Sequence, residues 1–195
     1  MIEDQSGTKL LMDYGLAPTK PPRYPSEAPV IDHAIITHSH IDHIGMAPWL
    51  VGHHGTTLHG SRLTSGLSEI MWRDTYKVSS IEGYPLAWDR RDLDAALEAW
   101  QEHGMGDLFS IGAWDAKFHV AGHIPGAVMT EMDVNGKKVL WTGDMDTRPS
   151  PNVSGAVPVE CDILCLEGTY GGKYHPDRLE EEERFVKRVL DVVSR

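Results

Sequence analysis

Four side chains that commonly bind metal ions fall within six positions in the N-terminal quarter of the chain. They directly follow a short apolar run, and they are His38, His40, Asp42 and His43. In an extended segment, residues two apart point the same way, so His38 and His40 can hold one ion together. Once the chain turns into a helix, Asp42 and His43 can face a second ion. Imidazole and carboxylate suit zinc, and iron or manganese would also fit. The alternative is a histidine-rich surface loop.

Two further candidate ligands come later, each at the end of a strand-like segment. His123 lies in the stretch Ala121-Gly122-His123, and its small neighbours let the backbone approach a metal closely. Asp144 ends the stretch Leu140–Asp144 and could bridge two ions. Each would read alone as a structural residue, but together with the first motif we expect both to bind metal.

Such a ligand set predicts a hydrolase. Two divalent ions roughly 3.5–4 Å apart can share a water and lower its pKa from 15.7 toward about 7. The hydroxide can attack a phosphodiester, an ester or an amide without a covalent enzyme intermediate. Asp13 follows an apolar segment, and we expect it to orient ligand histidines, although a turn-forming role is the alternative. For the other histidines, His175 near the mouth of the site included, surface or packing roles are expected.

Composition limits the partners. The formal net charge is −11, and the densest charge run, Glu180–Glu183, is acidic. Because nucleic-acid binding usually needs a basic patch, an RNA substrate would have to be held largely by something else. The chain has no apolar run of the roughly 20 residues that span a bilayer, and no signal-peptide pattern at its start. Cys161 and Cys165, about 13 Å apart if they share one strand, predict no disulfide and a cytoplasmic setting, or a nuclear one in a eukaryote.

The elements that must position these residues alternate between strands and helices, which predicts an α/β fold. Strand patterns cover Lys9–Asp13, Ala34–Thr37, Lys117–Ala121, Val128–Val134, Lys138–Thr142 and Asp162–Glu167. Helix patterns cover Asp42–Val51, Ser61–Lys77, Asp92–His103 with Gly104 as its C-cap, and Asp177–Ser194. Asn135-Gly136 predicts a hairpin, so the sheet is expected to be partly antiparallel.

The chain resembles the metallo-β-lactamase superfamily, whose His-x-His-x-Asp-His signature stands here at His38–His43. Within it, the sequence is similar to the β-CASP branch of RNA-processing nucleases. The stretches that carry this likeness are Leu10–Gly15, Ala121–Gly126, Leu140–Asp144 and Leu166–Gly171. The resemblance implies an αββα sandwich, incomplete at both ends, in which residues 1–195 form the N-terminal portion of the metallo-β-lactamase domain and about 161–195 lead toward a β-CASP cap.

The resemblance also implies roles for the site residues. His38, His40 and His123 would hold one ion, Asp42 and His43 the other, with Asp144 bridging. Glu167 would support a histidine general acid supplied later in the family's chain. We therefore expect a two-zinc ribonuclease, with catalytic roles for Asp13, Asp42 and Glu167, whose site is completed by a later segment or a second polypeptide.

Two other functions stay open, as does a homo-oligomer. One is a metallo-hydrolase of small esters, thioesters or lactones, which shares the ligand set but lacks the continuation Glu167–Gly171. The other is a non-catalytic subunit of an RNA-processing complex, which would usually have lost the ligand motifs that are intact here.

Overall fold

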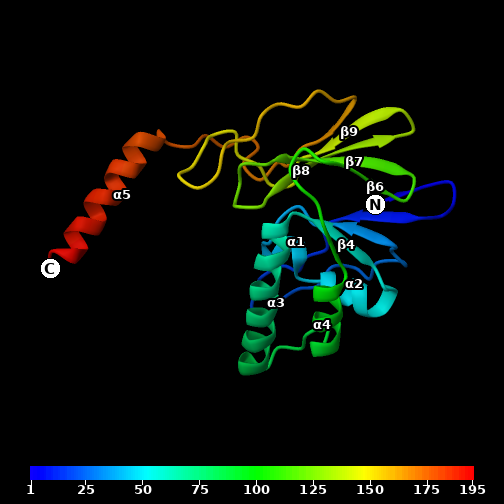
Figure 1. The fold of residues 1–195 in the computed structure, drawn as a ribbon. Helices are drawn as coiled ribbons and strands as arrows, with labels where there is room; N and C mark the ends of the chain where they lie inside the picture. The colour runs from blue at the N-terminus through cyan, green and yellow to red at the C-terminus, as the bar shows by residue number, and fades with distance from the viewer.

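Two five-stranded β-sheets stack face to face in the computed structural model, which describes residues 1–195 (Figure 1). The first sheet has the order β1 (Ile2–Glu3), β2 (Lys9–Met12), β3 (His33–Ile35), β4 (Thr57–Gly60) and β5 (Trp100–Glu102). The second has the order β10 (Ile163–Cys165), β9 (Lys137–Trp141), β8 (Val128–Val134), β7 (Trp114–Val120) and β6 (Leu108–Ile111).

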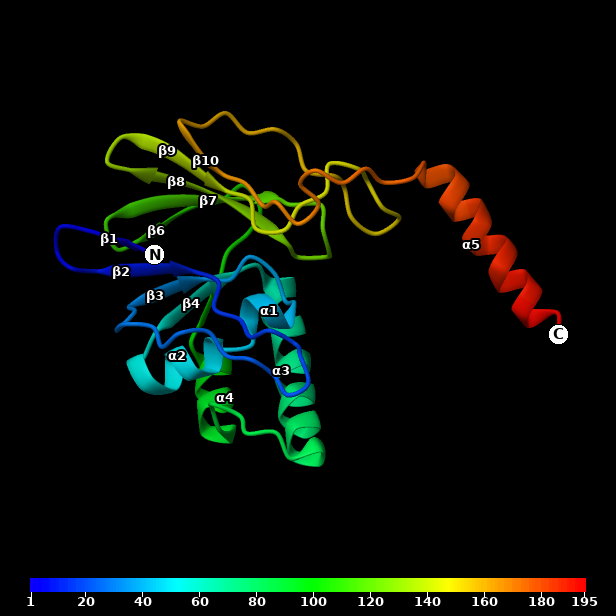
Figure 2. The same cartoon turned by 180° about the vertical axis from the view of Figure 1, so that it is seen from behind.

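Helices cover the outer face of the first sheet, as the two opposite views show (Figures 1 and 2). They are α1 (Ile41–Ile44), α2 (Ala47–His54), α3 (Arg62–Glu82) and α4 (Arg90–Glu98). Strands β2 to β5 run parallel, and parallel neighbours need long crossover connections, which α1–α4 supply for β3 to β5. This arrangement confirms the predicted α/β fold.

The second sheet is a meander, in which β6 to β9 are antiparallel and β10 joins β9 in parallel. The predicted hairpin connects β8 to β9. Its turn residues, Asn135 and Gly136, have φ angles of 55° and 74°. Both angles are positive, as the tight turn of a hairpin requires, so the Asn-Gly signal is confirmed.

Buried side chains join the layers. Leu10 and Ile35 of the first sheet pack against Phe118 and Val128 of the second. On the helical side, two buried tryptophans hold the segment after the metal motif. Trp72 Nε1 donates to the Ile44 carbonyl at 2.9 Å, and Trp88 Nε1 donates to the Gly45 carbonyl at 2.8 Å. Because both indoles are buried, these bonds fix where α1 ends.

Two predicted helices are divided or shortened in the structure. Asp42–Val51 is two helices, because the chain breaks at Gly45-Met46 and α2 begins at Ala47, with Pro48 in its first turn. The predicted helix Asp92–His103 ends at Glu98 and is capped at Ala99, so Gly104 is not its C-cap. The residues that follow, Trp100–Glu102, pair with β4 as the edge strand β5. Strands β1, β4, β5 and β6 were absent from the sequence prediction.

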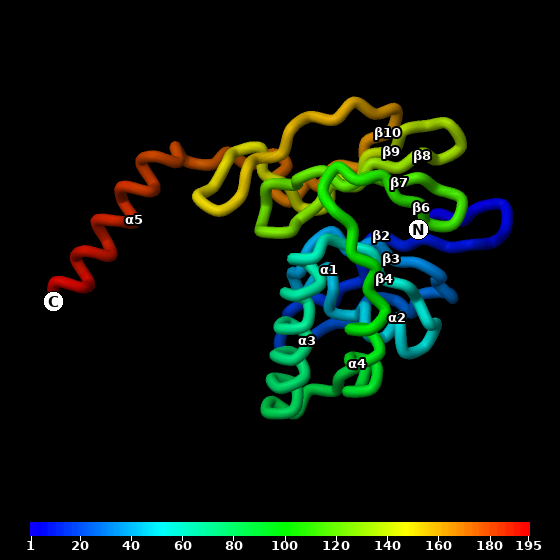
Figure 3. The backbone as a smooth tube through the Cα atoms, viewed as in Figure 1, coloured from blue at the N-terminus to red at the C-terminus, as the bar shows by residue number.

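The last helix, α5 (Arg178–Val193), extends away from the two-sheet body (Figures 1–3). None of its residues is buried, although it carries an apolar stripe that includes Phe185 and Val189. No helix lies over the outer face of the second sheet in either view (Figures 1 and 2). No helix has both the length and the apolar content needed to cross a membrane.

Candidate metal centre

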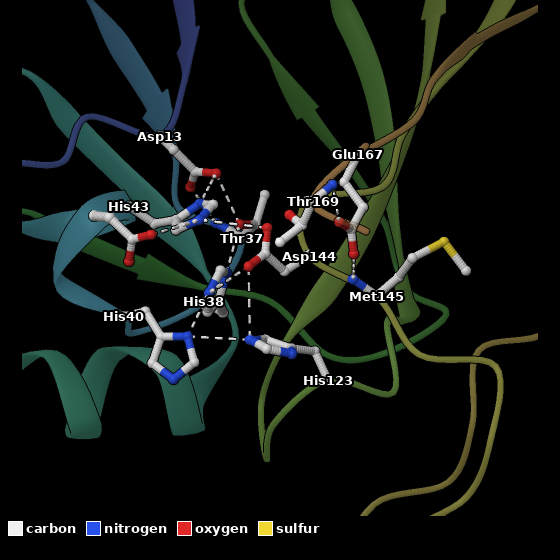
Figure 4. A network of polar contacts seen from close by, with 12 residues as sticks. Asp13, Thr37, His38, His40, His43, His123, Asp144, Met145, Glu167 and Thr169 are labelled. Atoms are coloured by element: carbon white, nitrogen blue, oxygen red, sulfur yellow. Dashed lines mark hydrogen bonds and ion pairs between the residues drawn. The ribbon is translucent and has the colours of Figure 1, made fainter. Parts of the chain in front are cut away.

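The predicted site residues all follow strands, and they meet at one edge of the two sheets (Figure 4). The five segments, each after its strand, carry Asp13 (β2), His38–His43 (β3), His123 (β7), Asp144 (β9) and Glu167 (β10). Carboxyl ends of parallel strands open at the same edge of a sheet, which explains why β2 with β3, and β9 with β10, deliver their residues side by side.

A first group holds three imidazoles and one carboxylate, with ligand atoms all within 4.8 Å of one another: His38, His40, His123 and Asp144. His40 Nδ1 lies 3.0 Å from both His38 Nε2 and His123 Nε2. Asp144 Oδ2 lies 3.9 Å from His38 Nε2 and 3.8 Å from His123 Nε2.

The donor set of this group fits a divalent cation. Each ring nitrogen of a neutral imidazole carries either one hydrogen or one lone pair. His40 Nδ1 therefore cannot donate a hydrogen bond to one of its two neighbouring nitrogens and accept one from the other. A cation among three lone pairs satisfies all three nitrogens, and the carboxylate balances its charge. The close approach of these four ligand atoms therefore indicates that this chain uses divalent metal.

A second group shares Asp144 with the first. Asp144 Oδ1 lies 3.5 Å from His43 Nε2, and Asp42 Oδ2 lies 3.9 Å from the same nitrogen. Asp42 is the most open of the three, with 56% of its side chain exposed. The two oxygens of Asp144 therefore face different groups, a geometry in which one carboxylate can contact two ions.

Asp13 lies behind both groups and connects to each. His43 Nδ1 lies 2.9 Å from Asp13 Oδ2, and Thr37 Oγ1 donates to the same oxygen at 2.8 Å. Since the Thr37 hydroxyl donates to Asp13, it can accept from His38 Nδ1, which lies 3.1 Å away. Both histidines then carry their hydrogen on Nδ1 and turn a lone pair on Nε2 toward the site.

Sequence reasoning missed Thr37. Its hydroxyl lies between Asp13 and His38, and its backbone N–H also donates to Asp13 Oδ1 at 2.7 Å. The available signal was its position, a hydroxyl residue directly before the first histidine of the motif.

The electrostatics of the histidines differ within the site. Burial and the neighbouring imidazoles lower the pKa of His38 to about 2, which keeps it neutral. Burial, together with His40, also lowers the pKa of His123. At His43, burial is outweighed by the hydrogen bond with Asp13 and by the carboxylates nearby, so its pKa is raised. Neutral imidazole is the form that binds metal, and His38 has it over the whole working range of pH.

A cavity of about 680 Å³ opens beside these residues. Among the residues that line it are His123, Asp144, Arg148, Glu167, Tyr170 and His175. His175 therefore lines the same cavity as the candidate ligands His123 and Asp144, with its ring centroid 4.5 Å from that of Tyr170. Arg148 and Tyr170 were not anticipated from the sequence.

Other histidines lie outside this centre. His59 is buried between His33 and His103, at nitrogen–nitrogen distances of 3.1 and 3.0 Å. His53 stacks on Trp49, with ring centroids 4.5 Å apart. These packing arrangements agree with the roles expected for them.

Comparison with known proteins gives matches over most of the chain. Residues 4–158 match the metallo-β-lactamase superfamily. Cleavage and polyadenylation specificity factor subunit 3 of Dictyostelium discoideum is 33% identical over 87% of this chain and 23% of its own length. Cleavage and polyadenylation specificity factor 73 of Drosophila melanogaster is 28% identical over 96% of this chain and 29% of its own. A probable RNase of Methanocaldococcus jannaschii is 27% identical over 96% of this chain and 46% of its own length. The chain thus spans less than half the length of these relatives.

Among solved structures, a metallo-β-lactamase of Cronobacter sakazakii matches 74% of this chain and 54% of its own, with a TM-score of 0.46 and 17% identity. The match to the superfamily pattern extends over well more than half of the chain and includes all of the candidate ligands. The relatives are those of the β-CASP branch whose motifs the sequence resembles. This chain belongs to the metallo-β-lactamase superfamily.

Proposed function

We propose that this chain is the metal-binding portion of a zinc-dependent ribonuclease that hydrolyses RNA phosphodiester bonds in RNA processing or decay. The relatives that share most of its length are named as ribonucleases or as subunits of a cleavage and polyadenylation factor. The chain spans less than half of each of these relatives, and we propose that residues 1–195 correspond to the N-terminal portion of a metallo-β-lactamase domain.

The observation that carries the proposal is the division of Asp144 between two groups of candidate ligands: one oxygen faces His38 and His123, and the other faces His43. We assign His38, His40 and His123 to one zinc ion, Asp42 and His43 to a second, and Asp144 to both. When bound, two such ions supply a hydroxide nucleophile and stabilise the charge that develops on a phosphoryl oxygen.

The remaining residues act on these ligands. Asp13 holds the Nδ1 hydrogen of His43 directly and that of His38 through Thr37, so both rings keep a lone pair for metal. Asp42 is open enough to meet solvent or substrate, which supports a catalytic role beside its ligand role. Glu167 lines the cavity with His123 and Asp144, and we propose that it can also support a general-acid histidine supplied from outside residues 1–195.

We further propose that another segment or a second polypeptide completes the site. The second group contains only one imidazole and two carboxylates, and Asp42 leaves it open on one side. Such a partner, or a second copy of this chain, would also supply basic surface for RNA, since this chain carries a net charge of −11. An RNA substrate implies action in the cytoplasm, or in the nucleus of a eukaryote.

Metal analysis combined with an RNA assay tests the proposal. The zinc-loaded chain should contain two equivalents of metal, and any cleavage of a labelled RNA should stop in EDTA. His40→Ala and Asp42→Ala should each lower bound metal and activity together. Activity that is unchanged in both variants would refute the assignment.

Substrate assays separate the alternatives. RNA that stays intact while a thioester or a lactone is cleaved identifies a small-molecule hydrolase. Two bound zinc ions with no turnover of RNA, thioester or lactone identify a non-catalytic subunit.

A further inference from the structure

Glu167 lines the same cavity as Asp144 and His123, but its carboxylate accepts hydrogen bonds from the backbone rather than from a histidine. It follows β10, and Asp144 follows the neighbouring strand β9, which runs in the same direction. The register pairs Cys165 with Trp141, so both acidic residues leave the sheet at the same edge. Figure 4 shows the Glu167 carboxylate turned toward backbone nitrogens, whereas the Asp144 carboxylate faces the imidazoles.

Both oxygens of Glu167 accept hydrogen bonds from the backbone. Oε1 accepts from the N–H of Met145 at 3.1 Å, and Oε2 accepts from the N–H of Thr169 at 3.1 Å. The backbone N–H of Glu167 donates to Thr142 Oγ1 at 3.2 Å. Glu167 therefore joins the loop that carries Asp144 to the loop that follows β10.

The polar partners of the Asp144 carboxylate are imidazole nitrogens at 3.5–3.9 Å, so the direction of the carboxylate depends on the backbone that carries it. On one side, Gly143 has a φ of 52° and packs so closely on Thr37 that a Cβ there would lie 2.8 Å from the threonine Cβ. On the other side, the peptide N–H of Met145 is held by Glu167. The backbone is thus held on both sides of Asp144, by the contact with Thr37 before it and by the hydrogen bond to Glu167 after it.

We infer that Glu167 is a positioning residue: by fixing the peptide after Asp144, it sets how the Asp144 carboxylate divides between the two groups of ligands. This inference rests on the proposed two-ion function, and it needs only residues of this chain. The second group should be more sensitive, because it has one imidazole where the first group has three.

Zinc or cobalt titration of the full chain tests the inference. Glu167→Gln keeps the size of the side chain, but its NH₂ group must face one of the two backbone N–H donors. The weaker of the two bound ions should lose tenfold or more in affinity, while the tighter ion changes less than threefold. The visible spectrum of the second Co²⁺ should change as well. Glu160→Gln, at an exposed position, is the control with the same change of charge and should bind as wild type.

A double-mutant cycle with Asp144→Asn distinguishes positioning from a general loss of stability. If Glu167 acts through Asp144, the double variant should lose little more affinity than Asp144→Asn alone. Additive losses, or wild-type affinity for both ions in Glu167→Gln, overturn the inference and leave the proposed function standing. A wild-type chain that never binds a second ion overturns both.

Amide exchange gives a measurement that needs no variant. The Met145 N–H of the wild-type chain should be protected from exchange with solvent because Glu167 accepts its hydrogen. Exchange of that amide at the rate of an unstructured peptide would contradict the inference even if Glu167→Gln failed to fold.

Discussion

Asp13 Oδ2 lies 2.9 Å from His43 Nδ1, and the same oxygen accepts the hydroxyl hydrogen of Thr37, which is the neighbour of His38. One carboxylate therefore fixes the ring orientation of histidines from both groups of the metal centre. The φ of Asp13 is 55°, an uncommon backbone conformation for a residue other than glycine. Strained conformations of this kind concentrate at functional sites, in agreement with the position of Asp13 behind the ligands.

Asp13→Asn should weaken metal binding without removing any ligand. The amide cannot present acceptors to His43, the Thr37 hydroxyl and the Thr37 N–H together. Removing a group that orients metal-bound histidines typically costs roughly 10–100-fold in affinity. Competition with a chelator measures this loss, and Asp74→Asn, at an exposed position on α3, is the matched control. Equal affinities in the two variants would show that Asp13 does not orient the ligands.

Metal should stabilise the fold, because its ligands come from both sheets. His38, His40 and His43 follow β3 of the first sheet, whereas His123 and Asp144 follow strands of the second. A ligand bound only by the folded chain adds about 2.7 kcal/mol when its free concentration is 100 times Kd. The melting temperature should therefore rise with zinc and fall in EDTA. Asp144→Asn should show a smaller rise, and an identical rise would argue against its role as a shared ligand.

The sequence indicated the candidate ligands because four of them lie within six positions, a density that can be recognised without knowledge of the fold. It also indicated the hairpin, because Asn135-Gly136 determines its turn locally. The short strands β4 and β5 could not be predicted in this way. They are three or four residues long and are held by pairing with a neighbouring strand rather than by their own pattern.

The hydrogen bonds that hold the candidate ligands in place could not be predicted from the sequence either. Thr37 and Asp13 are 24 residues apart, and Glu167 is 22 residues from Met145. Asp13 was expected to orient histidines, but the hydroxyl that extends its influence to His38 becomes visible only when β2 and β3 lie side by side. The sequence predicted one helix over Asp42–Val51, whereas the structure has a break at Gly45-Met46. That break depends on tertiary contacts, which the sequence pattern does not show. A Cβ at Gly45 would lie 2.6 Å from the Leu16 side chain.

Gly15→Ala should disturb the metal centre by steric conflict. A Cβ at Gly15 would lie 1.8 Å from the carbonyl oxygen of Asp42, so the start of α1 would have to move. Overpacking of this kind costs about 1–3 kcal/mol, and here it also displaces a candidate ligand. Gly66→Ala is the matched control, since Gly66 lies within α3 with no neighbour within 4 Å of a new Cβ. That control should gain about 0.5–1 kcal/mol in free energy of unfolding. Denaturant unfolding and metal titration of both variants check the contrast, and a Gly15→Ala chain that binds metal as tightly as wild type would contradict it.

His59 should make the fold sensitive to acid independently of the metal centre. It is 1% exposed, and its two ring nitrogens face His33 of β3 and His103, which follows β5. Phe109 lies alongside, and Asp107 is the carboxylate near His103. Burial and the two neighbouring imidazoles lower the pKa of His59 from 6.5 to about 3.

Because the pKa of His59 is lowered in the folded chain, acid should reduce the free energy of unfolding. Below pH 6.5 the unfolded chain gains a proton at residue 59 that the folded chain refuses until about pH 3, so the free energy of unfolding falls as the solution is acidified. At pH 5 this loss amounts to about 2 kcal/mol. His59→Phe removes the proton-binding group, so the stability difference between wild type and variant should shrink by that amount between pH 7.5 and 5. Urea unfolding of both chains in EDTA at the two pH values measures this change. If the difference in free energy of unfolding between wild type and His59→Phe stays the same at both pH values, the buried imidazole is not held neutral in the folded chain.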